Sequence, residues 1–289
     1  MEIMVCVKRV PMVGGRIVVT ADGQDVDTRM SGFTVSPHEE CAVEEAVRLV
    51  ERYGGNVTVL TLGPQAAADQ LRDMLALGAS RAVLLETDGR EWGPIATADA
   101  IVAAVRARAG QDGAARDPGC PYDLLLFGNE AADTGDYQVG VRVAHALGLP
   151  CVTGIKNLEV TMSAGGADGD AAESAAWPRG AAGAGGAAGA SARARREYRG
   201  TEENFDIPLP AVISVKEGIN LPRYPSLPGR LRAKRATIEQ SAPEWHPEGL
   251  RKERLRLPPG ETKRAEVLGT GTDAVPALVA LLDELGVLS

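Results

Sequence analysis

The chain has 289 residues, a length that predicts one large α/β domain or one domain with appendages. Apolar residues make up 44% of it and aromatic residues only 4%, so a globular core must be built mainly from Val, Leu, Ile and Ala. The formal net charge of −8 argues against a nucleic-acid partner, because binding a phosphate backbone needs a basic face.

Four cysteines are scattered along the chain, without a CxxC pair or a Cys/His cluster. This spacing argues against a zinc or iron–sulfur site and predicts reduced thiols. The chain begins with an apolar, strand-like run rather than a signal-peptide pattern, and no apolar stretch reaches the roughly 18 residues of a membrane span. We therefore expect a cytoplasmic protein with no membrane span and no bound metal.

Strand-like and helix-like segments alternate through the first half of the chain. Short apolar or β-branched runs predict strands at residues 2–10, 56–62, 82–85, 123–127 and 150–155. Apolar residues at helical spacing predict helices at 36–53, 65–77, 94–109 and 137–147, and Gly78 and Gly148 end two of these. Strands alternating with helices of this length imply βαβ crossovers, and hence a doubly wound, mainly parallel sheet.

The alternation stops after residue 160. Residues 163–193 are dominated by Ala and Gly, a composition that cannot bury enough apolar area to offset its ordering entropy. We predict a mobile insertion at 165–192 between two hairpin arms, 156–160 and 195–199. Residues 208–215 predict another strand.

The last part of the chain is rich in Pro and basic residues. Residues 236–269 are typical of an extended arm, and residues 272–285 resemble a capped helix. We therefore divide the chain into an α/β domain at 1–235, with the insertion at about 163–193, and a C-terminal arm and helix at 236–289.

The candidate binding segments are those that follow the strands, because open parallel sheets bind ligands beyond the carboxyl ends of their strands. Residues 128–140 form a polar, Gly-containing loop that runs into a helix, whose first N–H groups would suit a phosphate. Asp133, Thr134 and Gln138 could contact a ribose or brace this loop. An ordinary βα turn capped by its own side chains is the alternative.

Three shorter segments are weaker candidates. Lys8 and Arg9 follow the first strand, where an anion could approach or the two charges could simply be solvated. Ser36 begins a good helix start, with Pro and two acids in the first turn, and a helix cap is the simpler interpretation. The turn at 62–64 could admit a base or ring.

Several catalytic patterns are missing from the sequence. There is no GxGxxG fingerprint, no GxxxxGK[ST] phosphate loop, no GxSxG elbow and no HExxH. The three histidines, His38, His145 and His246, are far apart, and His38 has no cysteine or histidine cluster that would make it a metal ligand. We expect no catalytic residue and no acid–base chemistry of the chain's own.

Taken together and in order, these segments resemble the beta subunit of electron-transfer flavoproteins. The matching stretches are MVCVKRV, SPHEECAVEEAVRL, LGPQAAADQLRDMLALGASRAVLL, LLLFGNEAADTGDYQVG and LPAVISVKEGINLPRYPSLPGRLRAKRATIE, followed by a closing helix. The resemblance covers residues 1–160 and 200–239 well and the C-terminus loosely, and it fails over the insertion. AVEEAVRL and INLPRYPSLP are its most specific parts.

The resemblance implies a flavodoxin-like α/β fold, related to the adenine-nucleotide alpha-hydrolases, with a C-terminal arm that wraps an alpha subunit. It also implies an electron carrier rather than an enzyme. Such a carrier accepts electrons from flavin-dependent dehydrogenases and passes them to a quinone reductase or another acceptor. The alpha subunit would hold most of the FAD, and this subunit would hold a buried AMP or, as in bifurcating relatives, a second FAD.

By the same resemblance, the cofactor-contacting positions would be Cys6, Ser36, His38, Leu62, Asn129, Asp133, Thr134, Gly135, Asp136, Tyr137, Gln138, Val139 and Gly140. His38 stands where the family often has an aromatic residue near the flavin ring. Leu227 matches the leucine that relatives insert into a pocket on partner dehydrogenases, and a basic stretch follows it: Arg230, Arg232, Lys234 and Arg235. An apolar anchor with a charged rim suits partner docking.

The loop departs from the family pattern at one place. AMP-binding relatives commonly have D-D-D-x-N-Q-T-G, whereas residues 133–140 here are DTGDYQVG, and Ser36 stands where relatives often have Asn. AMP is the first expectation for this site, and a second FAD and an empty site are the alternatives.

Two other classes of function stay open from the residues alone. One is a stand-alone adenine-nucleotide-binding enzyme or sensor of the alpha-hydrolase type. The sequence lacks a Gly-rich phosphate loop that would support this interpretation, and the basic segment after Leu227 would be left unexplained. A homodimeric scaffold would leave the polar loop at 128–140 without a purpose.

Overall fold

The computed structural model describes residues 1–12, 17–111, 120–162, 190–249, 252–257 and 267–287. The chain divides into two compact units. The first comprises Met1–Arg16 and Thr28–Arg251, and the second Ile17–Asp27 and Lys252–Ser289.

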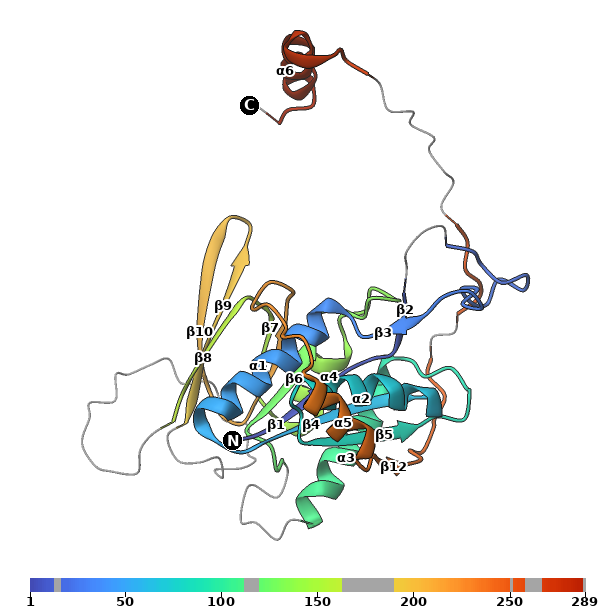
Figure 1. Ribbon diagram of the computed structural model, residues 1–289, viewed down its shortest axis with the longest axis vertical. Helices are drawn as coiled ribbons and strands as arrows, with labels where there is room; N and C mark the ends of the chain where they lie inside the picture. Colours follow the sequence, from blue (N-terminus) through green and yellow to red (C-terminus); the bar gives the residue numbers. More distant parts are fainter. Residues whose placement is uncertain (13–16, 112–119, 163–189, 250–251, 258–266, 288–289) are drawn as a thin grey trace, which may run out of the picture. The chain divides into compact units, whose positions relative to one another are not determined.

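A seven-stranded parallel sheet forms the centre of the first unit (Figure 1). Its strands, in spatial order, are β12 (Glu239–Ser241), β5 (Arg81–Glu86), β4 (Asn56–Gly63), β1 (Glu2–Cys6), β6 (Leu124–Gly128), β11 (Ala211–Val215) and β7 (Cys151–Ile155). The predicted α/β class with a parallel sheet is confirmed. The order around β1, with β4 and β5 on one side and β6 on the other, differs from the 2-1-3-4-5 order of flavodoxin itself.

Helices cover both faces of this sheet. The side chains of β1 alternate, so that Ile3 and Val5 pack with α1 (Pro37–Tyr53) and α2 (Ala68–Leu77). Met4 packs on the opposite face with α3 (Pro94–Gln111) and α4 (Val139–Leu147). The sheet is therefore doubly wound, as predicted.

Local signals set the helix ends. Ser36 caps α1 in a reciprocal capping box with Glu39. A single 3-10 turn, η1 (Gln65–Ala67), leads into α2, which ends at Gly78 with φ +136. Helix α4 starts two residues later than predicted, because the Asp136 carboxylate accepts the Gln138 N–H at 2.9 Å and keeps that residue outside the helix.

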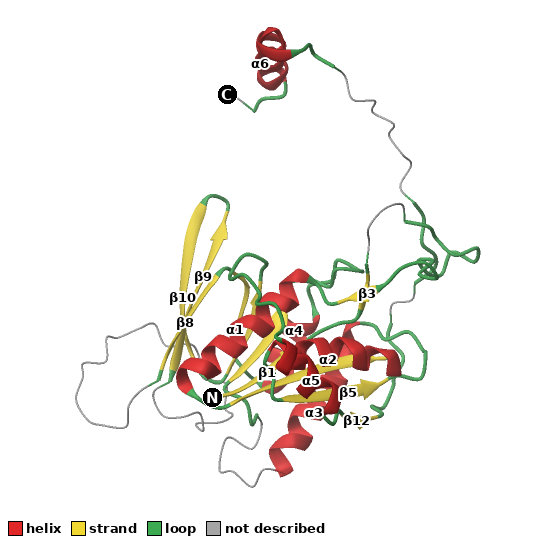
Figure 2. Cartoon of the chain, viewed as in Figure 1, coloured by secondary structure: helices red, strands yellow, loops and turns green. Residues whose placement is uncertain are grey.

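A second, antiparallel sheet contains the predicted hairpin (Figure 2). It consists of β8 (Asn157–Thr161), β9 (Ser191–Tyr198) and β10 (Thr201–Pro208), and β8 pairs with β9 from Asn157↔Arg195 to Thr161↔Ser191. The predicted insertion was too long at its end, because residues 191–193 already belong to β9. Its remainder at 163–189 lies outside the described residues.

One prediction for the following segment needs correction, and the structure adds a helix after it. Residues 208–215 are not one strand: β10 ends at Pro208 and β11 begins at Ala211, with Pro210, which has no N–H for a sheet ladder, between them. The basic stretch after Ser226 is a helix, α5 (Leu227–Arg235), which Ser226 caps by accepting the Gly229 N–H at 3.1 Å. A short antiparallel pair, β2 (Val10–Pro11) and β3 (Phe33–Thr34), completes the unit.

The second unit is small. Val19 and Val26 form an isolated bridge, and Leu255 N–H donates to the Gly23 carbonyl at 2.7 Å. The predicted C-terminal helix is confirmed as the turn η2 (Gly271–Ala274) followed by α6 (Val275–Glu284). Across the part of the chain that is described, none of the helices has the length and apolar character needed to cross a membrane.

Candidate functional site

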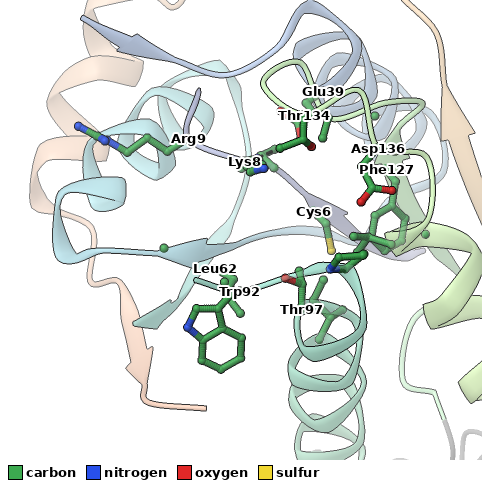
Figure 3. Close-up of a pocket in the computed structure, with 18 of the residues that line it drawn as sticks. Cys6, Lys8, Arg9, Glu39, Leu62, Trp92, Thr97, Phe127, Thr134 and Asp136 are labelled. Carbon is green, nitrogen blue, oxygen red and sulfur yellow. Dashed lines mark hydrogen bonds between the residues drawn. The ribbon is translucent and has the colours of Figure 1, made fainter. Parts of the chain in front are cut away.

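A cavity of about 420 Å³ opens where the strand order reverses. The chain runs from β1 to β4 and β5, then returns through α3 to β6 on the other side of β1. The carboxyl ends of β1 and β6 therefore border a crevice, which is where open α/β sheets bind ligands. Cys6 and Phe127, which are partners across these two strands, both line the cavity (Figure 3).

The polar loop after β6 forms one side of this cavity. It tightens around Ala131, whose carbonyl accepts the Thr134 and Gly135 N–H groups at 3.2 and 2.7 Å. The predicted positions that line the cavity are Cys6, Leu62, Asn129, Thr134, Asp136, Tyr137, Val139 and Gly140. The predicted positions outside its lining are Ser36, His38, Asp133, Gly135 and Gln138.

Gly140 places the first turn of α4 directly on the sheet. A Cβ at this position would lie 3.2 Å from both Phe127 Cγ and Ser214 Oγ. Because the helix can approach this closely, its N-terminal residues Val139 and Gly140 reach the cavity, where their end of the helix dipole favours an anion.

Ser36 serves α1 rather than the cavity. Its side chain is buried, and its hydroxyl donates to Glu39 Oε2 at 3.0 Å while accepting the Glu39 N–H at 3.3 Å. His38, in the first turn of the same helix, accepts the Glu217 N–H on Nδ1 at 3.0 Å and so ties α1 to the segment after β11.

Glu39 is a buried carboxyl in the cavity wall that sequence reasoning treated only as an acid in a first helical turn. Its Oε1 accepts the Lys8 N–H at 3.0 Å, which joins α1 to the end of β1. Burial raises the pKa of Glu39 to about 7, although hydrogen bonds from Lys8 and Ser36 oppose the shift. Gly128 allows this packing, since a Cβ there would come within 2.7 Å of Glu39 Cγ.

Charged side chains of both signs surround the opening. Lys8 Nζ forms an ion pair with Asp133 at 2.7 Å, so Asp133, which does not line the cavity, contacts a residue that does. Tyr137 donates a short hydrogen bond to Glu130, and this bond raises the pKa of the Tyr137 hydroxyl. Arg9 points away from Lys8 in Figure 3, and its guanidinium lies 3.2 Å from the Phe33 ring centroid.

Residues before α3 and in its first turn form a wall of the cavity that the sequence analysis did not identify. Arg90, Glu91, Trp92, Gly93, Pro94 and Thr97 all line the cavity. The Trp92 indole nitrogen is buried and has no hydrogen-bond acceptor among the described residues. A signal was available, because this segment also follows the carboxyl end of a parallel strand.

The site is built for binding. Burial, and then the neighbouring Glu39 carboxylate, raise the pKa of the Cys6 thiol far above its ordinary value, so the thiol stays protonated and is a poor nucleophile. Apolar contact surface from Leu60, Leu62, Phe127 and Ile101 lies beside Lys8 and the N-terminus of α4. An apolar pocket with basic side chains in its lining and a helix N-terminus fits a nucleotide, with a base or ring on the apolar side and a phosphate at the polar end.

The predicted docking residues lie on α5 and are exposed. Leu227 is 71% exposed, and Arg230, Arg232, Lys234 and Arg235 are exposed on the same helix. Leu221 and Tyr224, just before the helix, are 83% and 96% exposed. An apolar row with a basic rim is thus presented to solvent, which is the composition of a binding surface.

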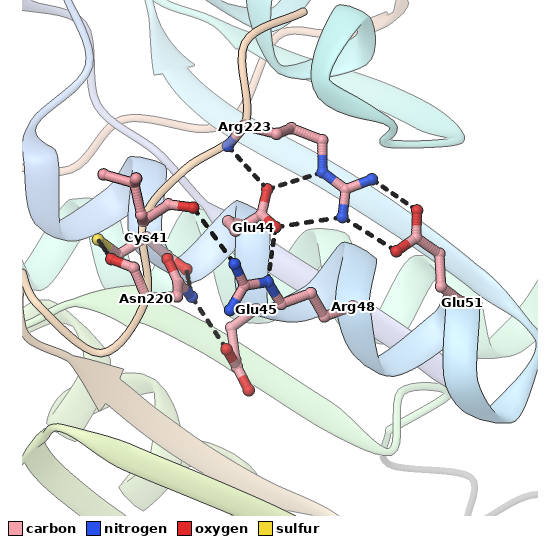
Figure 4. A network of polar contacts seen from close by, with 8 residues as sticks. Cys41, Glu44, Glu45, Arg48, Glu51, Asn220 and Arg223 are labelled. Atoms are coloured by element: carbon pink, nitrogen blue, oxygen red, sulfur yellow. Dashed lines mark hydrogen bonds and ion pairs between the residues drawn. The ribbon is translucent and has the colours of Figure 1, made fainter.

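This exposed row is held in place by helix α1 (Figure 4). Arg223 Nε and Nη2 donate to the two oxygens of Glu44 at 2.9 and 3.1 Å, and Arg223 Nη2 also donates to Glu51 at 3.0 Å. Asn220 Nδ2 donates to the Cys41 carbonyl at 3.0 Å and to Glu45 at 2.9 Å. Burial alone would raise the pKa of Glu44, but the hydrogen bonds from Arg223 outweigh it and lower that pKa.

Comparisons with known proteins point to the same family across most of the chain. The profile of the family described as "Electron transfer flavoprotein domain" matches residues 26–173. The "Electron transfer flavoprotein subunit beta" of Bacillus subtilis is 31% identical over 210 residues, 72% of this chain and 66% of that protein. The protein of the same name from Syntrophomonas wolfei is 30% identical over 243 residues, 84% of this chain and 80% of that protein.

A relative with a different name matches a shorter part of the chain. The "Acryloyl-CoA reductase electron transfer subunit gamma" of Anaerotignum propionicum is 35% identical over 156 residues, 53% of this chain and 54% of that protein.

Proposed function

The chain belongs to the electron transfer flavoprotein family, among its beta subunits, and from this premise we propose that it is the nucleotide-binding and partner-docking half of a heterodimeric electron carrier. An alpha-type subunit would complete the FAD site. Electrons would arrive from flavin-dependent dehydrogenases and leave to a quinone reductase or another acceptor.

One structural relationship supports this proposal most directly: helix α1 borders the cavity and also holds the exposed apolar row. Glu39 in its first turn lines the cavity, and Glu44 and Glu51 further along bind Arg223. A carrier needs a bound nucleotide and a rigid surface for its partners in the same subunit. Both features here are built on one element.

The cavity is proposed to hold AMP, with a second FAD as the alternative. Lys8 and the first N–H groups of α4 would bind the phosphate, while Leu62, Trp92 and Phe127 would contact the base or ring. FAD, when bound, supplies the electron chemistry. The role of this chain's residues is to bind the nucleotide, exclude water and orient the partner subunit.

Exposed residues of α5 are proposed to dock the donor dehydrogenase. Leu227 would be the apolar anchor, and the basic side chains around it would steer a partner that carries an acidic rim. The described contacts of Arg223 keep this anchor in position before the partner arrives, which reduces the ordering cost of binding.

We further propose a cytoplasmic location, which the four free cysteines support. The alternative of a stand-alone adenine-nucleotide enzyme or sensor gains no support from the cavity. The buried Cys6 thiol of the cavity is held protonated, and the buried Glu39 carboxyl already accepts hydrogen bonds from the backbone N–H groups of Lys8 and Ser36.

Cofactor content is the decisive measurement. The chain should be colourless when produced alone, and the complex with its alpha-type subunit should contain one FAD and one AMP after extraction and chromatography. Two FAD per complex would assign the cavity to the second flavin. Tight stoichiometric FAD in the isolated chain, or turnover of an adenine nucleotide, would contradict the carrier proposal.

A further inference from the structure

The cavity wall formed by residues 90–97 is braced by a distant part of the chain. Residues 245–248, here called the strap, follow β12 and make contacts onto residues 90–99. Trp245 Nε1 donates to the Glu91 carbonyl at 3.0 Å, and the Arg90 guanidinium lies 4.9 Å from the Trp245 ring centroid. His246 Nε2 lies 3.0 Å from Asp99 Oδ2 on α3.

Glu248 makes the most specific of these contacts. Helix α3 begins at Pro94 after Gly93, which has no side chain to cap the helix. Glu248 Oε1 accepts the Ala96 N–H at 2.7 Å, so a residue 152 positions away performs the role that a Ser or Asp at the cap would perform locally. Gly93 makes room for the carboxylate, since a Cβ at that position would overlap it.

The front of the same segment faces the cavity. Arg90, Glu91, Trp92, Gly93, Pro94 and Thr97 are all lining residues. In Figure 3, Trp92 and Thr97 lie on one side of the cavity, beside the start of α3. Residues 90–97 therefore contact the strap and also line the cavity, whose lining does not include Trp245, His246 or Glu248.

We propose that Glu248 is a positioning residue for the nucleotide cavity. Through the Ala96 amide it holds residues 90–97 in the shape that binds the nucleotide, so nucleotide binding and docking of the strap are thermodynamically linked. The inference rests on the proposed nucleotide function of the cavity. Linkage requires reciprocity: the docked strap raises the affinity for the nucleotide, and bound nucleotide stabilises the docked strap.

The strap is also where the chain leaves the first unit, which ends at Arg251. Strand β12, just before it, pairs with β5 from Glu239↔Val83 to Ser241↔Leu85. Anchoring on both β12 and the cavity wall gives the base of the C-terminal arm a defined position, and the nucleotide contributes to that position through residues 90–97.

The test uses the full-length chain purified with its alpha-type subunit, freed of bound nucleotide, with AMP as the probe. Glu248→Ala should weaken AMP binding in calorimetry by about fivefold or more, the lower end of typical coupling between sites. Glu248→Gln keeps an acceptor oxygen for Ala96 and should retain most of the affinity. Glu244→Ala, which removes an exposed carboxylate just before the strap, is the matched control and should bind AMP as the wild type does.

Hydrogen exchange supplies a readout that a purely structural role would not change. In the wild-type protein, AMP should slow exchange of peptides covering residues 90–99 and also of those covering 243–249. In Glu248→Ala the second protection should disappear even at saturating AMP. Equal AMP affinities for wild type and Glu248→Ala, or strap exchange that does not respond to AMP, would overturn the inference alone. Failure of the wild type to bind AMP would overturn the proposed nucleotide function and the inference with it.

Discussion

Arg223 binds the buried carboxylate of Glu44 by three hydrogen bonds, from its backbone N–H at 3.1 Å, from Nε at 2.9 Å and from Nη2 at 3.1 Å. The two residues are 179 positions apart in the chain. Through this pair, helix α1 of the α/β domain fixes the segment that leads to the exposed Leu227.

Removing the Arg223 guanidinium should leave the buried Glu44 carboxylate with Arg48, whose Nε donates to it at 2.7 Å, as its remaining cationic partner. We expect Arg223→Ala to lower the free energy of unfolding by about 1.5 to 3 kcal/mol, the usual cost of losing a hydrogen bond to a charged group. Urea denaturation measures this, with Lys234→Ala as an exposed control that should change stability by less than about 0.5 kcal/mol. Arg223→Lys should recover only part of the loss, because an ammonium cannot bind both carboxylates in the same geometry. A loss no larger than that of the control would contradict the assignment.

Leu227→Ala should weaken docking without disturbing the flavin. Truncating an apolar anchor at the centre of an interface typically costs about 2 kcal/mol, so reduction by the donor dehydrogenase at low concentration should slow about 30-fold. Flavin content, read from the visible spectrum, should stay at the wild-type value. Met30→Ala removes another exposed apolar side chain, far away in the sequence, and should have no effect on the rate. Loss of flavin in Leu227→Ala would mean that the residue is structural.

The raised pKa of Glu39 predicts a specific pH dependence of stability. Because the folded state holds this proton more tightly than the unfolded state, the stabilisation is complete below pH 4.5 and is lost as pH rises from 4.5 to about 7. The full effect is at most about 3 kcal/mol. Glu39→Gln should remove this pH dependence, because the amide does not titrate. The free energy of unfolding of the wild type should therefore fall relative to that of the variant as pH rises from 4.5 to about 7. Urea titrations at pH 5, 6, 7 and 8 measure it, and parallel curves would refute the prediction.

Lys8 should contribute directly to nucleotide affinity. Lys8→Met removes a cation at the polar end of the cavity and should raise the Kd for AMP about tenfold or more, the usual value of a hydrogen bond to a charged group. Its ion pair with Asp133 is partly exposed, so stability should change by less than about 1 kcal/mol. Calorimetry compares it with Lys156→Met, an exposed lysine just after β7. Equal AMP affinities for the two variants would show that Lys8 does not contribute to nucleotide binding.

The Ala/Gly-rich insertion should be dispensable for the hairpin that it interrupts. Strands β8 and β9 pair up to Thr161↔Ser191, so a short Gly-Ser bridge can replace residues 165–189 without breaking a ladder bond. By loop-closure entropy alone, the shorter connection should change stability by less than about 1.5 kcal/mol. Gel filtration with the alpha-type subunit measures assembly, and failure to form the heterodimer would show that the insertion takes part in it.

Much of the fold could be predicted because its signals are local. The alternation of β-branched runs with helical periodicity predicted the order of strands and helices, and the cap at Ser36 and the glycine at 78 located the ends of α1 and α2. One strand that was not predicted, β10, depends on a non-local term. Strand β10 is rich in charge, yet it forms because Arg193 and Arg196 of β9 pair with Asp206 and Glu203 across the ladder.

The features of the candidate site also divide into those that local sequence predicts and those that depend on tertiary contacts. The polar, glycine-containing loop after β6 and the apolar anchor before a basic stretch could both be located from the sequence, because each is a pattern of neighbouring residues. The tertiary structure alone decided that Glu39 is buried with a raised pKa while Glu40 beside it is not part of the cavity lining. It also decided that Trp92 lines the cavity, that Glu248 caps α3 and that Arg223 binds Glu44. A sequence does not show whether a charged or aromatic side chain is solvated or buried. The packing of distant elements determines its environment.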